Sequence, residues 1–157
     1  MNNNEVAVLA DNVPVRIAPS ILPEPFASMM QGREKKQLSG VFGLTNITVN
    51  LTRIKPKSVS ALRHAHITDD EFVYILQGNP TLHTNKGFTD MSPGMCAGFK
   101  AGAGDAHCLV NNTDEDVIYL EAGDNTPGDG VIYPDDDLKL SQVDGKWICY
   151  HKNGEKY

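Results

Sequence analysis

The sequence has no long apolar run and few cysteines. No apolar segment approaches the roughly 20 residues that a membrane-spanning helix needs, and residues 1–5 lack the basic and apolar regions of a secretion signal. Three cysteines, Cys96, Cys108 and Cys149, form neither an even disulfide framework nor a CxxC metal knuckle. We therefore expect a cytoplasmic protein without a membrane partner, and we assign the cysteines no role.

Basic residues are also scarce and scattered. The formal net charge is −6, and Arg33, Lys35 and Lys36 form the only tight basic group. Nonspecific nucleic-acid binding needs clustered cations that neutralise phosphates. We expect no nucleic-acid partner, which leaves a small molecule as the expected ligand.

The chain length of 157 residues suits one domain with one core. Residues 1–40 contain Pro14, Pro19, Pro23 and Pro25, and X-Pro steps favour extended backbone that cannot fill a central strand. This region predicts an extended N-terminal arm with one short helix near residues 26–30. The arm is expected to pack on a second region, residues 41–157, that forms the folded body and ends in a hairpin.

From residue 40 onward the pattern favours β-strands. Ile47, Val49 and Leu51 alternate with polar residues, as in a half-buried strand. Turn-forming residues separate further short strands, expected at 71–77, 81–84, 95–99, 107–111, 117–121 and 147–150. Regular spacing without alternating helices predicts an all-β, antiparallel sandwich or barrel.

The segment 71–77, with the sequence EFVYILQ, is apolar on both faces. Val73 and Ile75 share one face, and Phe72, Tyr74 and Leu76 share the other. Such a strand is expected to be covered on both sides, by a second layer or by another subunit. We therefore expect a homodimer.

Two histidines one residue apart form the most informative motif. In a strand, His64 and His66 point the same way, roughly 6.5 to 7 Å apart, and can converge on one ion. If the strands that begin at Glu71 and His107 face the same cavity, these two residues complete a set of four ligands. Three imidazoles and one carboxylate suit one divalent transition metal (Fe, Mn, Ni, Co or Zn) rather than Ca or Mg.

The spacing of His64, His66, Glu71 and Gly78 resembles the first motif of the cupin superfamily, G-x5-HxH-x3,4-E-x6-G, with Ser58 at its leading glycine. Further segments resemble small bacterial cupins that are sometimes labelled sugar-phosphate-isomerase-like; they lie at residues 43–46, 74–78, 122–124 and 133–138. The resemblance covers residues 40–125. It implies a jelly-roll barrel, a metal held by His64, His66, Glu71 and His107, and a dimer.

The second cupin motif, G-x5-PxG-x2-H-x3-N, fits in two ways. One alignment starts at Gly94, has Lys100 in place of proline and carries two extra residues before His107; the other restores that spacing but places Cys96 at the leading glycine. If the Gly102-Ala103-Gly104 turn absorbs the insertion, His107 faces the metal, whereas a one-residue slip would turn Cys108 inward. We predict that His107 faces inward.

Three further polar residues are candidates for the cavity: His83 as an acid or base, Asn111 as a hydrogen-bonding group, and Lys100 as a contact to an anionic substrate. No catalytic residue is assigned. The leading hypothesis is a metal-dependent enzyme that acts on a small oxygenated anionic metabolite by isomerisation, decarboxylation or oxygenation. The alternative is a non-catalytic cupin module that binds a metal or a metabolite.

Overall fold

The computed structural model describes residues 6–17 and 20–157, and within them β-strands dominate. The helical segments are short: a 3-10 turn at Ala10–Asn12, α1 at Phe26–Met29 and α2 at Leu38–Val41. The strands are β1 Arg33–Gln37, β2 Ile47–Ile54, β3 Ser58–Val59, β4 Ala65–His66, β5 Glu71–Gln77, β6 Thr81–Thr84, β7 Gly87–Asp90, β8 Cys96–Phe99, β9 Cys108–Asn111, β10 Val117–Asp124, β11 Gly130–Tyr133, β12 Leu138–Val143 and β13 Lys146–Tyr150. No helix among the described residues is long and apolar enough to cross a membrane.

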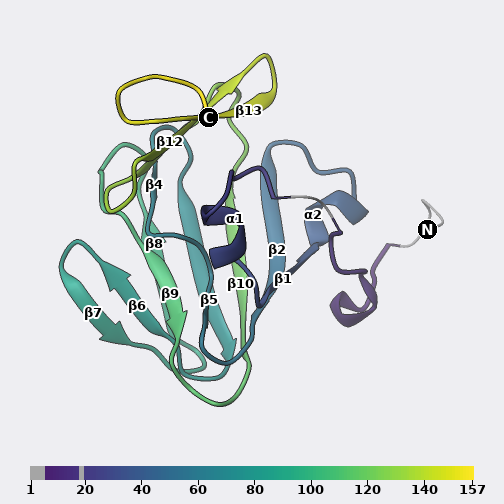
Figure 1. The fold of residues 1–157 in the computed structure, drawn as a ribbon. Helices are drawn as coiled ribbons and strands as arrows, with labels where there is room; N and C mark the ends of the chain where they lie inside the picture. Colours follow the sequence, from purple (N-terminus) through teal and green to yellow (C-terminus); the bar gives the residue numbers. More distant parts are fainter. Residues whose placement is uncertain (1–5, 18–19) are drawn as a thin grey trace.

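The strands form three sheets, all with antiparallel pairing (Figure 1). One has five strands in the order β1-β2-β10-β5-β8, and the other two have four strands each, β13-β12-β11-β4 and β3-β9-β6-β7. The prediction of an antiparallel all-β fold is confirmed. Closure of these sheets into a barrel stays a prediction.

Two apolar clusters hold the sheets together. The first joins the five-stranded sheet, through Ile54, Ile75 and Tyr119, to Leu82 and Leu109 of the β3-β9-β6-β7 sheet. The second lies on β11 and β12, where α1 covers the sheet; it comprises Phe26, Met30, Leu62, Val131, Tyr133, Leu138 and Leu140. Burial of these side chains is the main force that stacks the layers.

Strand β5 forms as its alternation predicts, but only one of its faces is covered within the chain. Val73 and Ile75 are 5% and 0% exposed, whereas Phe72, Tyr74 and Leu76 are 44%, 38% and 44% exposed. Of the two expected alternatives, a second layer from the same chain does not bury this face within the described residues. Cover by another subunit stays a prediction.

The expected N-terminal arm contains one strand that its sequence does not predict. Strand β1 has the charged sequence REKKQ, with no apolar alternation. It pairs with β2 over five residues, from Arg33 opposite Ile54 to Gln37 opposite Asn50, and forms the edge of the five-stranded sheet. Charged residues suit an edge strand because its outer side is open to solvent. The expected arm also includes residues 1–5 and 18–19, which lie outside the described residues, and the domain boundary at residue 40 stays a prediction.

The expected C-terminal hairpin is present. Strands β12 and β13 pair from Lys139 opposite Tyr150 to Val143 opposite Lys146. The two turn residues, Asp144 and Gly145, both have positive φ, at 50° and 74°, as a tight two-residue hairpin turn requires.

Candidate metal centre

Short backbone pairings position the histidines of the HxH motif. His66 lies opposite Val131 of β11, and His64 forms an isolated antiparallel bridge with His107. The bridge has two hydrogen bonds: the His107 N–H donates to the His64 carbonyl at 2.8 Å, and the His64 N–H donates to the His107 carbonyl at 3.1 Å. Strand alternation turns Ala65, between the two histidines, to the opposite face, where it is buried.

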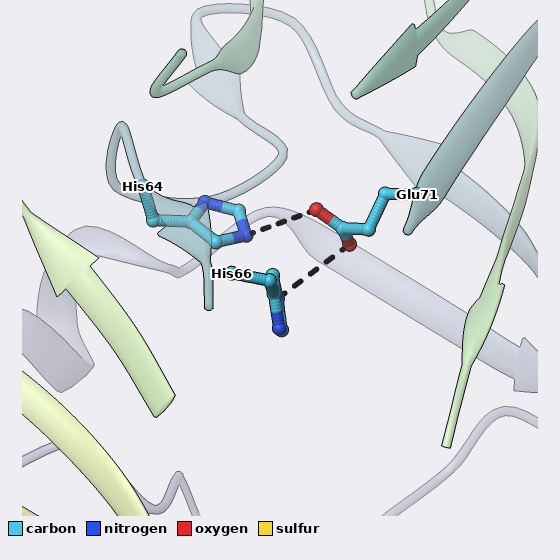
Figure 2. Close-up of side chains that lie close together, drawn as sticks. All are labelled: His64, His66 and Glu71. Atoms are coloured by element: carbon cyan, nitrogen blue, oxygen red, sulfur yellow. Dashed lines mark ion pairs between the residues drawn. The ribbon is translucent and has the colours of Figure 1, made fainter. Parts of the chain in front are cut away.

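The side chains of His64, His66 and His107 meet at the carboxylate of Glu71. His64 Nε2 lies 3.7 Å from Glu71 Oε2, and His66 Nε2 lies 3.7 Å from Glu71 Oε1. Figure 2 shows these two imidazoles directed at the two carboxylate oxygens. His107 Nε2 lies 3.1 Å from Glu71 Oε2. The structure thus brings together all four residues of the predicted ligand set.

Two of the rings are oriented by bonds on their far side. His64 Nδ1 donates to the Leu62 carbonyl at 2.8 Å, and His66 Nδ1 bonds to Asp129 Oδ2 at 2.5 Å. Because a carbonyl can only accept, the His64 proton sits on Nδ1, and a carboxylate favours the same tautomer in His66. Both Nε2 lone pairs therefore face Glu71, as metal ligation needs.

Asp129 is a functional residue that the sequence does not predict. It is 1% exposed, and its Oδ1 accepts hydrogen bonds from the Thr68 backbone N–H and hydroxyl, both at 2.9 Å. It lies between β10 and β11 in a Gly-Asp-Gly turn, and its separation from His66 in the chain leaves no local signal for their contact.

His107 occupies a dry part of the site. Its ring stacks on Phe99 with centroids 3.4 Å apart and planes 3° apart, and its side chain is 7% exposed. Among the described residues, neither His107 Nδ1 nor Glu71 Oε2 has a hydrogen-bond partner, although both are buried. An unsatisfied buried polar atom is costly. A cation among the Nε2 atoms and Glu71 Oε2 would satisfy this carboxylate oxygen, so the residues fit the divalent metal that their chemistry predicts.

The charges of the site also suit a metal. Burial, together with the neighbouring imidazoles of His107 and His66, lowers the pKa of His64 to about 4, against the attraction of Glu71. Burial would raise the pKa of Glu71, but the close approach of His107, together with the other two imidazoles, brings it down to about 2. At neutral pH the ligand set therefore has an ionised carboxylate and an uncharged His64, the forms that bind metals.

The four residues line a cavity of about 560 Å³. A second polar group, built on β1, β2 and β10, lies on the same cavity: Glu121 accepts hydrogen bonds from Lys35 Nζ at 2.6 Å, Asn50 Nδ2 at 3.0 Å and Tyr119 Oη at 3.2 Å. Burial would raise the pKa of Glu121, but the charge of Lys35 holds it below the ordinary value. The cavity thus contains a second, ionised carboxylate in addition to Glu71.

Asn111 was expected in the cavity, but the structure places it elsewhere. Its amide nitrogen donates to the carbonyls of Ile54, Lys55 and Glu115 at 3.0, 3.1 and 2.7 Å, and its oxygen accepts from Thr113. Asn111 is 0% exposed and fastens the end of β9 to neighbouring loops. Its polar atoms are thus occupied by backbone and turn contacts.

His83 and Lys100 do not line the cavity either. Leu82 is buried in the core, so alternation along β6 turns His83 away from it, and its ring stacks on Phe88 at 4.2 Å. Lys100 is exposed and lines a more open groove that also includes Phe72, Phe99 and the ligand Glu71. The three residues were selected by residue type, whereas the face of each strand decides which side chains reach the cavity.

The alternative register, with Cys108 facing inward, is not the one observed. Gly102 and Gly104 both have positive φ, at 67° and 70°, so the glycine turn accommodates the two extra residues. Cys108 is buried outside the cavity, and burial raises the pKa of its thiol to about 11. Arg63, next to His64, also points away and forms a two-pronged ion pair with Asp135 at 2.7 and 2.8 Å.

Comparison with known proteins supports this architecture. The Cupin domain family model matches residues 50–123. The crystal structure of a sugar phosphate isomerase from a cupin superfamily, from Silicibacter pomeroyi, is 34% identical with a TM-score of 0.91, and the alignment covers 96% of each chain. A protein from Acidithiobacillus ferrooxidans is 27% identical with a TM-score of 0.73, over 87% of this chain and 96% of the other.

A polyketide cyclase from Streptomyces resistomycificus, 17% identical, has a TM-score of 0.62 over 76% of this chain and 79% of the other, a similarity that concerns the fold alone. No curated protein matches this chain. The family model and the near full-length similarity to the Silicibacter pomeroyi protein indicate the same family. The chain belongs to the cupin superfamily.

Proposed function

We propose that this cupin is a metal-dependent enzyme that acts on a small oxygenated anion, with His64, His66, Glu71 and His107 as the ligands of one divalent metal. The observation that carries the proposal is the convergence of three imidazole Nε2 atoms on one buried carboxylate. A bound divalent ion would supply Lewis-acid polarisation of the oxygen atoms of a metabolite.

Isomerisation is the reaction that we favour. The 34% identical protein from Silicibacter pomeroyi is described as a sugar phosphate isomerase, which supports a sugar derivative as the substrate class. Isomerisation of a hydroxy-carbonyl compound moves a proton between neighbouring carbons. It therefore needs cavity groups that hold the substrate and exclude water.

The cavity offers such groups. Burial raises the pKa of the Tyr133 phenol, which keeps it protonated and able to donate a hydrogen bond to a substrate oxygen, whereas the Tyr119 hydroxyl already donates to Glu121. Tyr133 stacks beside His64, with ring centroids 5.9 Å apart, and so lies next to the ligand set. Glu121 is held in one orientation by Lys35 and Asn50, and it provides an ionised acceptor on the same cavity.

The test starts with the metal content of protein purified without an affinity tag. We expect about one equivalent of a first-row transition metal, and its loss in the His107→Ala variant. The matched control is His83→Ala, which removes a histidine that does not line the cavity and should leave the metal content unchanged. Metal retained by His107→Ala at the wild-type level would contradict the four-ligand set.

Substrate specificity is then tested with the metal-loaded protein. A panel of aldose and ketose phosphates and hydroxy acids should include a compound that the wild-type protein isomerises and the His107→Ala variant does not. Saturable binding of a metabolite without turnover would instead favour the binding-module alternative.

A further inference from the structure

Strand β1 carries two cations into the cavity that holds the ligand set. Arg33 and Lys35 alternate with Glu34 and Lys36, and only Arg33 and Lys35 line the cavity. Pairing of β1 with β2, and of β2 with β10, sets Lys35 in the same row as Tyr119 of β10. Both cations therefore belong to the inner face of the five-stranded sheet.

The two cations differ in whether their charge is neutralised. Lys35 is paired with Glu121, with its Nζ 2.6 Å from Oε1. Among residues 6–17 and 20–157, no carboxylate forms an ion pair with Arg33, whose side chain donates a hydrogen bond from Nη1 to the Ser60 carbonyl at 2.7 Å. A guanidinium has five N–H donors in a planar fork, so most of the donors of Arg33 have no protein acceptor in this part of the chain.

Arg33 also lies close to the groups that surround the metal ligands. Burial raises the pKa of Tyr119 and of Tyr133, and in both cases the charge of Arg33 opposes that rise. The charge of Glu71 acts on the same Tyr133 phenol in the other direction. Tyr133, which lines the same cavity, is therefore within electrostatic reach of both Arg33 and the ligand carboxylate.

We propose that Arg33 recognises the anionic group of the substrate, a carboxylate or a phosphate, while other oxygens of the same molecule lie at the ion that the four ligands would hold. The proposal deepens the proposed function, on which the assignment of this anion to a substrate rests. An unpaired, half-buried cation is unfavourable until a partner arrives, and a guanidinium binds carboxylate and phosphate oxygens with two parallel hydrogen bonds. The cavity volume of about 560 Å³ lies within the range of small-molecule sites.

Anion binding is measured by calorimetric titration of the purified protein at constant ionic strength, with inorganic phosphate and acetate as separate probes. At least one probe should bind the wild-type protein, and Arg33→Gln should weaken that binding roughly tenfold or more, because a charge-assisted pair is lost. Arg33→Lys keeps the positive charge but loses the planar pair of N–H donors, so its anion affinity should lie between those of the wild type and Arg33→Gln.

The matched control is Arg53→Gln. Arg53 lies on β2 and forms ion pairs with Glu34 and Asp116, but it does not line the cavity. Its replacement should leave anion affinity at the wild-type value. A stronger response to phosphate would identify a phosphorylated substrate class, and a stronger response to acetate a carboxylated one.

Two outcomes would overturn the proposal: neither probe binds the wild-type protein, or Arg33→Gln binds the probes as well as the wild type does. The metal content of the same samples separates this inference from the proposed function. A metal-loaded protein whose anion affinity is insensitive to Arg33 refutes only the role of Arg33. A protein that binds anions through Arg33 but takes up no metal refutes the metal-dependent function and leaves the anion site intact.

Discussion

Replacing Asp129 with asparagine should weaken metal binding without unfolding the protein. The buried Asp129 carboxylate faces three donors, one on His66 and two on Thr68. An amide offers one acceptor oxygen and two N–H donors, so at least one of these three donors must then face an N–H. If that donor is His66 Nδ1, the ring changes tautomer and its proton moves to Nε2, where it blocks the lone pair directed at Glu71.

The expected magnitude follows from the contacts that are lost. Partners that orient a ligating histidine typically contribute 10- to 100-fold to metal affinity, which corresponds to about 1.4–2.8 kcal/mol. A hydrogen bond to a charged group is worth about 1.5–3 kcal/mol, a range that agrees with this loss. The free energy of unfolding should fall by a similar amount, which is small beside the roughly 5–15 kcal/mol of a typical domain.

The measurement is a competition for Zn²⁺ between the protein and a chromophoric chelator, together with urea denaturation of the same samples. Asp90→Asn is the control, because Asp90 is an exposed carboxylate that bonds to Thr81 on β6. Thr68→Ala, which removes one of the two Thr68 donors, should have an intermediate effect. Unchanged Zn²⁺ affinity in a folded Asp129→Asn protein would refute the role given to this carboxylate.

Three further perturbations test the fold and its surfaces. Gly78→Ala should destabilise the protein more than Gly87→Ala in urea denaturation. Both glycines have positive φ, which costs an alanine about 1–2 kcal/mol, but only at Gly78 would a Cβ meet a backbone oxygen, that of Asp116, at 2.6 Å. Equal losses of unfolding free energy in the two variants would contradict this clash. Lys35→Met should leave Glu121 uncompensated and lower the free energy of unfolding by about 1–3 kcal/mol at neutral pH. Lys35 lowers the pKa of Glu121 in the folded state, so the ion pair stabilises the protein above the pKa that Glu121 has in the unfolded chain. This stabilisation disappears as the pH falls through the pKa of Glu121 in the folded protein, so the wild type and Lys35→Met should have similar stability at low pH. A stability difference that does not depend on pH would refute this reasoning. Light scattering at micromolar concentration should show a dimer. Phe72→Lys should disrupt this dimer and Phe88→Lys should not, because Phe72 lies on the exposed face of β5 and Phe88 lies on β7. A monomeric wild-type protein would refute the dimer.

Local patterns predict the strands whose own residues alternate. Strand β5 is an example, because Val73 and Ile75 are apolar and buried on one face. Strand β2 also forms where its residues alternate, but its buried residues, Thr52 and Ile54, lie on the face opposite Ile47, Val49 and Leu51. Strand β1 could not be predicted in this way, since its residues are all polar or charged and it exists through pairing with β2. Information about β1 therefore lies in its distant partner and not in its own sequence.

The same distinction applies to the site. His64 and His66 could be predicted because two residues of one strand are separated by a fixed repeat. Arg33 and Glu121 come from β1 and β10 and meet at one cavity only in the tertiary fold, and the same fold brings Asp129, from the turn before β11, to His66. His83 was a reasonable candidate by residue type, but its place depended on the phase of alternation in β6, which the burial of Leu82 determines.

His107 shows why the altered second motif still places its histidine inward. A two-residue insertion in a flexible loop changes where the chain enters a strand but does not by itself change which residues pair. Here the reciprocal backbone hydrogen bonds between His107 and His64, at 2.8 and 3.1 Å, set the register, and moving the chain by one residue would break both. Such a slip would also move Leu109 out of the core, where it is 2% exposed. The glycines at 102 and 104 adopt the positive φ values that the longer turn needs, so the insertion changes the turn and leaves the strand in register.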